Sequence, residues 1–587
     1  MNRKNLTAAV LAGLAGVAGA AGNLQAAAHA VNMNPDGLGD VLIYPYYTTD
    51  GDNTTLLTVV NTTGDAKAVK VRFLEGYNSR EVLDFNLYMS KHDVWVAGIV
   101  AVSGASTDPV PTPYAAGSLG AKLVVPDTSC TVPYLYMNVD EDTGAKHEQK
   151  FLDLAYTGMF ADEGPQDIGR VSEGHFEVIE MGTLTGLAAE NVTHQPANAD
   201  GIRMPKDCAA LSTWWTDFGG TSPDGIWYEE AVKKDNCEPY PLSGKIEDLE
   251  FSGCQADMYT KRNSGGLFGA AAVVNSQDGA MYSYDAKAIQ GFDDTADGIH
   301  YIPGTIYPSL NSGSIETSWV FFGVPQNEAV DLDYSTDDDI NRSVDAVSSV
   351  FMHDTVMNEY YVEGSDAPAT EWILTFPTKN FYADFDRMCM VGLISEDDCT
   401  GDPDADPVVP PKMQARAPFT AYYGQVDSND DPVCETVSLR TWDREEDTYI
   451  PTDPSNPIRP PVVSPSLPVC DDADDPRCRP GEAPFQICNE VNVLRFGERV
   501  IFGTPELSGE SLLLSVEDEF GKGWGRLTFT GANVDRNGLL GLPVAGFAAY
   551  RLSNGFVESP DGNVKATYGA VFGHKGNVRQ GAVAQPV

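Results

Sequence analysis

Clusters of aspartates in polar loops are the residues best suited to chemistry in this sequence. One acidic loop covers residues 331–345, and a second stretch, DPDAD, covers residues 402–406. Ca²⁺ prefers oxygen ligands, and a flexible loop can gather several carboxylates around one ion. We therefore predict calcium as the cofactor. Its candidate ligands are Asp333, Asp337, Asp338, Asp339, Asp402, Asp404 and Asp406. Neither stretch completes the EF-hand pattern, so solvated acidic turns are the alternative.

The motifs of the common hydrolases are incomplete. A serine hydrolase of the α/β type needs Gly-x-Ser-x-Gly, but the nearest stretch, residues 116–120, begins with Ala116. The sequence HEQKF at His147 lacks the second histidine of the zinc motif HExxH. A glycosidase needs a pair of acids, and Glu180 and the WDREE stretch at 442–446 place acids beside apolar or aromatic residues. Ion pairing with Arg444 or simple solvation is their alternative role, so no catalytic residue is assigned.

Three groups of aromatic residues could form a ligand surface. They are Trp214–Trp215, Tyr44–Tyr47 (which includes Pro45) and Tyr360–Tyr361. Such rings suit contacts with carbohydrate or protein, and packing in a β-sheet core is the alternative.

The elements that hold these residues are predicted to be mainly β-strands. In the stretch AVKVRFLEG, Val69, Val71 and Phe73 alternate with Lys70 and Arg72, which indicates a strand with one apolar face. Further alternating stretches follow, separated by turns rich in Gly, Asp and Asn, and no βαβ alternation is visible. We predict a mainly β fold of antiparallel, immunoglobulin-like β-sandwich units with few short helices. On the outer face, Lys70 and Arg72 would pair weakly with acids such as Glu75 or Asp84.

Two segments have the spacing of helices. Residues 208–218 suit one short helix, and residues 343–362 are the best candidate for a longer one. The apolar stripe of the longer segment is diluted by β-branched residues. Residues 371–385 read instead as a strand that Pro377 ends or bulges.

Composition divides the chain into five predicted segments. They are a signal peptide (1–30), an N-terminal β-sandwich (31–125), a central β-rich region with short helices (126–398), an insertion or linker (399–490) and a C-terminal β-unit (491–587). The insertion is rich in proline and aspartate, which favours an extended and irregular chain.

The first segment predicts export. Arg3 and Lys4 precede an apolar core at 6–22, and Ala28-His29-Ala30 fits a cleavage site after Ala30. No other apolar run of about 18 residues follows, so we expect no transmembrane segment in the mature chain. The predicted location is the periplasm, the cell surface or the medium.

Cysteine usage agrees with an oxidising compartment. All 10 cysteines follow the predicted signal peptide, and an even number in an exported chain indicates disulfides. Close spacing favours three pairs, although spacing alone cannot fix connectivity. The favoured pairs are Cys237–Cys254, Cys389–Cys399 and Cys470–Cys478. The second pair spans the start of the predicted insertion, and the third lies within it.

The net charge excludes one class of partner. With 85 acids against 38 lysines and arginines, the chain has a formal charge of −47. Each phosphate contact needs a basic side chain, so binding to nucleic acid or to an anionic membrane surface is not expected.

Four phrases carry a resemblance. HFEVIEMG (175–182), EWILTFPTKNFY (371–382), TWDREE (441–446) and GLPVAGFAAY (541–550) resemble phrases of large secreted proteins of Gram-negative bacteria. The resemblance implies export in a Gram-negative cell and brings no activity with it. With the other features, it favours a non-enzymatic surface, matrix or adhesion protein that binds a surface polymer, a protein or itself. A secreted hydrolase that acts on a glycan through a carboxylate pair is the alternative.

Overall fold

The structure is a computed structural model that describes most of the chain beyond the predicted signal peptide. The described residues are 30–102, 120–135, 149–199, 201–215, 259–260, 265–295, 299–323, 328–335, 343–362, 368–390, 392–394, 396–401, 413–430, 432–444, 448–449, 483–497, 499–502, 511–514, 521–557 and 564–581.

Sheet A is the largest of the described sheets and has 10 strands. Its order is β16 (Glu328–Asp333), β15 (Thr317–Phe322), β1 (Val31–Met33), β14 (Lys287–Gln290), β2 (Val41–Thr48), β10 (Glu173–Leu184), β4 (Ala66–Glu75), β5 (Glu81–Met89) and β8 (Cys130–Val132), with β11 (Tyr259–Thr260) on β10. Strand β10 is antiparallel to both neighbours and aligns Phe176 with Phe73. Only the pair β1–β15 is parallel among the described pairings of this sheet.

Sheet B packs on one face of sheet A. Its order is β13 (Ala280–Asp285), β12 (Leu267–Asn275), β3 (Asn53–Asn61), β6 (Val94–Ala101), β7 (Ala121–Val124) and β9 (Gln149–Lys150). The inward side chains of both sheets, such as Tyr44, Phe73 and Phe176 from sheet A and Leu57 and Trp95 from sheet B, form one buried core. The two sheets are therefore a β-sandwich.

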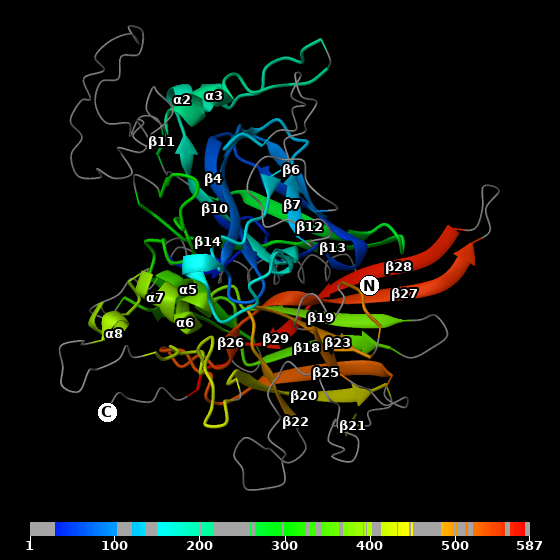
Figure 1. The fold of residues 1–587 in the computed structure, drawn as a ribbon. Helices are drawn as coiled ribbons and strands as arrows, with labels where there is room; N and C mark the ends of the chain where they lie inside the picture. Colours follow the sequence, from blue (N-terminus) through cyan, green and yellow to red (C-terminus); the bar gives the residue numbers. More distant parts are fainter. Residues whose placement is uncertain are drawn as a thin grey trace, which may run out of the picture.

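Sheets C and D form a second sandwich from the later part of the chain (Figure 1). Sheet C has the order β21 (Thr448–Tyr449), β20 (Glu435–Asp443), β25 (Lys522–Phe529), β18 (Thr355–Tyr361) and β29 (Lys575–Asn577), with β22 (Ala483–Ile487) on β20. Sheet D has the order β24 (Ser511–Leu514), β23 (Val491–Phe496), β19 (Ala369–Thr375), β27 (Ala545–Val557) and β28 (Val564–Gly573). A separate pair joins β17 (Met352–His353) to β26 (Leu542–Pro543).

The predicted mainly β, antiparallel sandwich fold is confirmed by these sheets, while its finer immunoglobulin-like character stays a prediction. The sheets combine strands from distant parts of the chain, as β3 pairs with β12. The five predicted segments also stay a prediction.

The described helices are short. They are α2 (Gly186–Asn191), α3 (Cys208–Thr213), α5 (Ser343–Ser349), α6 (Asn380–Ala383), α7 (Phe385–Met390) and α8 (Glu396–Thr400), with 3₁₀ turns η2 (Asp50–Asp52), η3 (Gly158–Phe160) and η4 (Ile168–Ser172). None of these described helices has the length and apolarity needed to cross a bilayer.

The predicted long helix at 343–362 is wrong. Helix α5 ends at Ser349, and the chain then forms β17 and β18. The segment carries β-branched and aromatic residues that pack well in strands, and the β18 backbone bonds to both β25 and β29. The strand predicted from residue 371 exists as β19 but ends at Thr375, and α6 follows it.

Lys70 and Arg72 do not lie on an exposed face, which corrects a second expectation. Every residue of β4 is buried, and both side chains are covered on the face of sheet A that turns away from sheet B. Lys70 pairs with Asp84 as predicted, and Arg72 pairs with Glu177 and, at 2.6 Å, with Glu81. These are buried ion pairs, whose partners depend on each other far more than surface pairs do.

Three disulfides join described cysteines, which confirms that the protein contains disulfide bonds. They are Cys130–Cys208, Cys389–Cys399 and Cys434–Cys488. The last one ties the start of β20 to the end of β22, which are neighbouring strands of sheet C.

Candidate functional site

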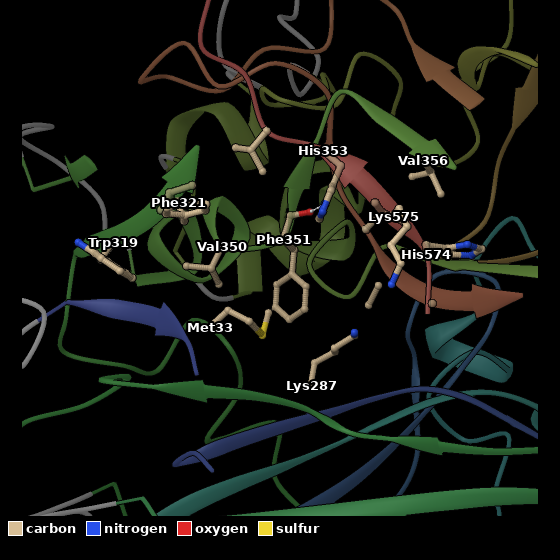
Figure 2. A pocket seen from close by; sticks show the side chains of 15 residues that line it. Met33, Lys287, Trp319, Phe321, Val350, Phe351, His353, Val356, His574 and Lys575 are labelled. Carbon is tan, nitrogen blue, oxygen red and sulfur yellow. Dashed lines mark hydrogen bonds between the residues drawn. The ribbon is translucent and has the colours of Figure 1, made fainter. Parts of the chain in front are cut away.

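A cavity of about 280 Å³ lies where the edge of sheet A meets the second sandwich. Strands β1, β14 and β15 line one side, and β17, β18, the start of β27 and the β28–β29 junction line the other. We call it the basic cavity. Figure 2 shows the side chains that surround it.

Most of its wall is apolar. Met33, Trp319, Phe321, Phe351 and Val356 all contribute, and they come from three separate strands and the turn after α5. Alternation along β15 explains part of this wall, because the buried Val320 and Phe322 point into the core while Trp319 and Phe321 are left on the other face. The wall therefore suits the apolar body of a small ligand.

The polar part of the wall is entirely basic or neutral. Lys287, His353, His574 and Lys575 are its ionisable residues, and no Asp, Glu, Ser, Thr or Cys is among the residues that line it. In a chain with 85 acids and 38 lysines and arginines, a site lined by two lysines and no acid is unusual. The cavity thus presents a positive potential inside a strongly negative molecule.

Lys287 is the central charged group. Its ammonium makes no ion pair or hydrogen bond with any described residue, and Figure 2 shows Lys287 and Lys575 reaching into the same space. Burial lowers the pKa of Lys287, and the like charge of Lys575 lowers it further, while Asp285 opposes both effects. An anion between the two ammonium groups would favour the charged form of each.

His353 forms part of the wall between the two lysines and Phe351. Its Nδ1–H donates to the carbonyl oxygen of Phe351 at 2.8 Å, which fixes the tautomer. Burial lowers the pKa of His353, and the positive charge of Lys287 lowers it further. The ring also packs on Gly576, where a Cβ atom would lie 2.0 Å from the His353 Cδ2 atom. The shape of this wall therefore depends on glycine at position 576.

His574 is held as a neutral structural group. Its Nε2–H donates to the carbonyl oxygen of Ile373 at 2.9 Å, and its Nδ1 accepts from the Asn358 amide at 3.2 Å. Burial lowers the pKa of His574 to about 3. Both ring nitrogens are occupied, so this histidine is not free to move a proton.

The lining of the cavity suits an apolar ligand that carries negative charge. Its residues supply apolar contact and positive charge, and because the lining has no hydroxyl, thiol or carboxylate, the lysine amines are the candidate nucleophiles among the lining residues. This placement differs from the site that the sequence predicted.

Of the predicted calcium ligands, only Asp333 lies within the described residues. It ends β16, is exposed, and its Oδ1 accepts from the backbone N–H and the hydroxyl of Ser335. Asp337, Asp338, Asp339, Asp402, Asp404 and Asp406 lie outside the described residues. Over the part of the chain that is described, no group of three or more His, Cys, Asp or Glu side chains is placed to hold a metal. The calcium site stays a prediction.

The other predicted residues have structural surroundings. Glu180 pairs with Lys67 at 2.9 Å and accepts from the Gly265 N–H at 2.8 Å. The aromatic groups at 44–47, 214–215 and 360 are buried in cores. Cys389 and Cys399 are bonded to each other, whereas Cys237, Cys254, Cys470 and Cys478 lie outside the described residues.

Sequence reasoning missed all four basic residues of the cavity. Lys287 and Lys575 are far apart in the chain, and only the packing of β14 near β29 brings them together. The one available signal was their type, because lysine is scarce in this chain.

Comparison with known proteins adds no relative. No protein-family model matches the chain, and no similar curated protein or solved structure was found. The site must therefore be interpreted from its own chemistry.

Proposed function

We propose that the protein is an exported, non-enzymatic binding protein of the cell surface or its surrounding matrix, and that the basic cavity holds a small apolar molecule carrying one anionic group. The observation that supports this proposal is the pair of lysines, Lys287 and Lys575, in a cavity whose lining is otherwise apolar or neutral.

The energetics favour an amphiphilic anion over a neutral molecule. Apolar surface gains roughly 25 cal/mol for each Å² removed from water, so the aromatic wall binds the body of the ligand. A carboxylate that accepts from a partly buried ammonium gains about 1.5–3 kcal/mol more. The head group thus supplies specificity, and the body supplies much of the affinity.

The size of the cavity restricts the ligand. A volume of about 280 Å³ suits a short aliphatic or single-ring acid and is too small for a polymer. The alternative prediction, a glycan hydrolase, would need a carboxylate pair elsewhere, because the cavity lining contains no acid.

Calorimetric titration with octanoate, octanol and octylammonium tests the cavity. We expect octanoate to bind more tightly than the other two, and Lys287→Met to weaken its binding about 10- to 100-fold, as the loss of one charge-assisted hydrogen bond implies. Lys91→Met is the matched control, because Lys91 is exposed in a turn of the first sandwich. Equal affinities for octanoate and octanol, or an unchanged affinity in Lys287→Met, would contradict the proposal.

A further inference from the structure

The outward face of sheet C carries a stacked pair of tryptophans. Trp442 of β20 lies directly opposite Trp524 of β25, with ring centroids 4.2 Å apart and ring planes 9° from parallel. The Trp524 side chain is 37% exposed, so an indole surface is available to solvent. Alternation places Leu439 and Leu527 on the other face, in the core.

Two arginines lie beside this pair on the same face. Arg440 and Arg526 are also direct cross-strand partners, and their guanidinium carbons lie 5.7 and 5.2 Å from the centre of the Trp442 ring. Neither guanidinium forms an ion pair with any residue in the described part of the chain. We call Arg440, Trp442, Trp524 and Arg526 the Trp–Arg face.

Stability explains the stacked tryptophans better than it explains the two facing arginines. Like charges directly opposite each other on neighbouring strands destabilise a sheet. The contact of each guanidinium with the indole offsets part of this loss of stability. The chain has 85 acids from which a partner could come. The nearest acid in the register is Glu359, the exposed cross-strand partner of Trp524, and it makes no ion pair with Arg526. The two positive charges are therefore left free for a ligand.

We propose that the Trp–Arg face binds an extended polysaccharide that carries carboxylate groups. The apolar face of a sugar ring can stack on an exposed indole, and a guanidinium binds a carboxylate through two parallel hydrogen bonds. A sheet surface accommodates a polymer, in contrast to the small basic cavity. The two arginines complement an acidic glycan, whereas the overall charge of −47 opposes nucleic acid, whose phosphates need many basic contacts.

This site is independent of the basic cavity, because it lies on the outer face of β20 and β25 and shares no residue with the cavity lining. It supplies the surface-polymer partner that the proposed function leaves open. Failure at one site would leave the other untouched.

Binding of the full chain to hyaluronan, dextran, polyglutamate and single-stranded DNA tests the proposal. We expect binding to hyaluronan that weakens with added salt, and at least tenfold weaker binding to the other three. The double substitution Arg440→Gln with Arg526→Gln should lower hyaluronan affinity at least tenfold. It should also leave the melting temperature unchanged or raise it, since it removes a like-charge pair.

Trp524→Ala should lower hyaluronan affinity by a similar factor, while Arg203→Gln, an exposed arginine before α3, should leave it unchanged. Lys287→Met should also bind hyaluronan normally. The proposal is overturned if the full chain does not bind hyaluronan, if dextran, polyglutamate or DNA binds as well, or if the double arginine variant keeps its affinity while folded.

Discussion

Lys287 illustrates how a single residue can define a site in this protein. Its ammonium lacks a carboxylate partner in the described part of the chain, faces Lys575 across an apolar cavity, and has a pKa lowered by burial and by that neighbour. Several buried bases, such as Arg72 and Arg170, have close carboxylate partners. We explain this unpaired ammonium in so acidic a chain by an anionic ligand that pairs with it.

The buried carboxyl group of Glu371 predicts a pH dependence of stability. Burial raises its pKa from 4.5 to about 7, although the N–H groups of Ile501 and Phe502 donate to it. A raised folded-state pKa contributes stability below pH 4.5 that is lost as the pH rises through 7. Glu371 should therefore contribute a fall of roughly 1 kcal/mol in the unfolding free energy between pH 6.5 and 8.

Urea denaturation at the two pH values measures this change. Histidines with lowered pKa values, such as His175 and His300, add stability as the pH rises through their unfolded-state pKa of 6.5, so the contribution of Glu371 is obtained by comparison with Glu371→Gln. Burial also raises the pKa of Glu490, which acts in the same direction as Glu371. The pH slope should be smaller in Glu371→Gln, whatever its absolute stability, and an equal slope in both proteins would contradict the assignment.

At the scale of elements, local pattern predicted strands better than it predicted their surroundings. The alternation around Val71 correctly separated the core-facing residues of β4 from Lys70 and Arg72. It could not show that both faces are buried, because the acids that complete Arg72 come from β5 and from the distant β10. The helix predicted at 343–362 was wrong for a related reason, since pairing of β18 with β25 and β29 overrides the weak helical spacing of the segment.

Strand β29 offers a direct test of the cavity wall. Gly576→Ala would place a methyl group 2.0 Å from the His353 ring, so we expect a loss of about 1–3 kcal/mol in unfolding free energy. Octanoate affinity should fall as well, because His353 lines the cavity. Gly573→Ala is the control, since no atom lies within 4 Å of its added Cβ. Equal stabilities of the two variants by thermal unfolding would show that the wall is not tightly packed.

The acidic loops predict an effect of calcium at the same scale. If they hold Ca²⁺, the melting temperature should rise with millimolar CaCl₂ and fall with EDTA, because a ligand that binds only the folded state stabilises it. Asp333→Asn should reduce the rise, whereas MgCl₂ should not reproduce it. An identical melting temperature in CaCl₂ and EDTA would favour plain solvated turns.

On the scale of the whole molecule, the two sandwiches share their cores. Tyr46 of β2 lies 5.1 Å from the ring of Phe502, and Tyr284 of β13 stacks on Phe547 of β27 at 4.8 Å. One buried cluster includes side chains of sheets A, B and D, and another joins sheet A to sheets C and D. The sequence could not predict that the two sandwiches share a core. The pattern of each strand shows only that one face is apolar, and it does not show which sheet covers that face.

Such shared packing predicts cooperative unfolding. Thermal unfolding followed by circular dichroism and by tryptophan fluorescence should give one transition with the same midpoint, although the chain is long enough for separate domains. Two resolved transitions would show that the sandwiches are stable without each other and that the shared core contributes little.

The central claim is that the basic cavity holds an apolar anion between Lys287 and Lys575. A crystal structure of the protein grown with 8-bromooctanoate tests it most directly, since the bromine can be located by its anomalous scattering. We predict bromine within the apolar wall near Phe351 and the carboxylate between the two ammonium groups, with both absent in crystals of Lys287→Met. A cavity without bromine, or a carboxylate that points away from both lysines, would contradict the account.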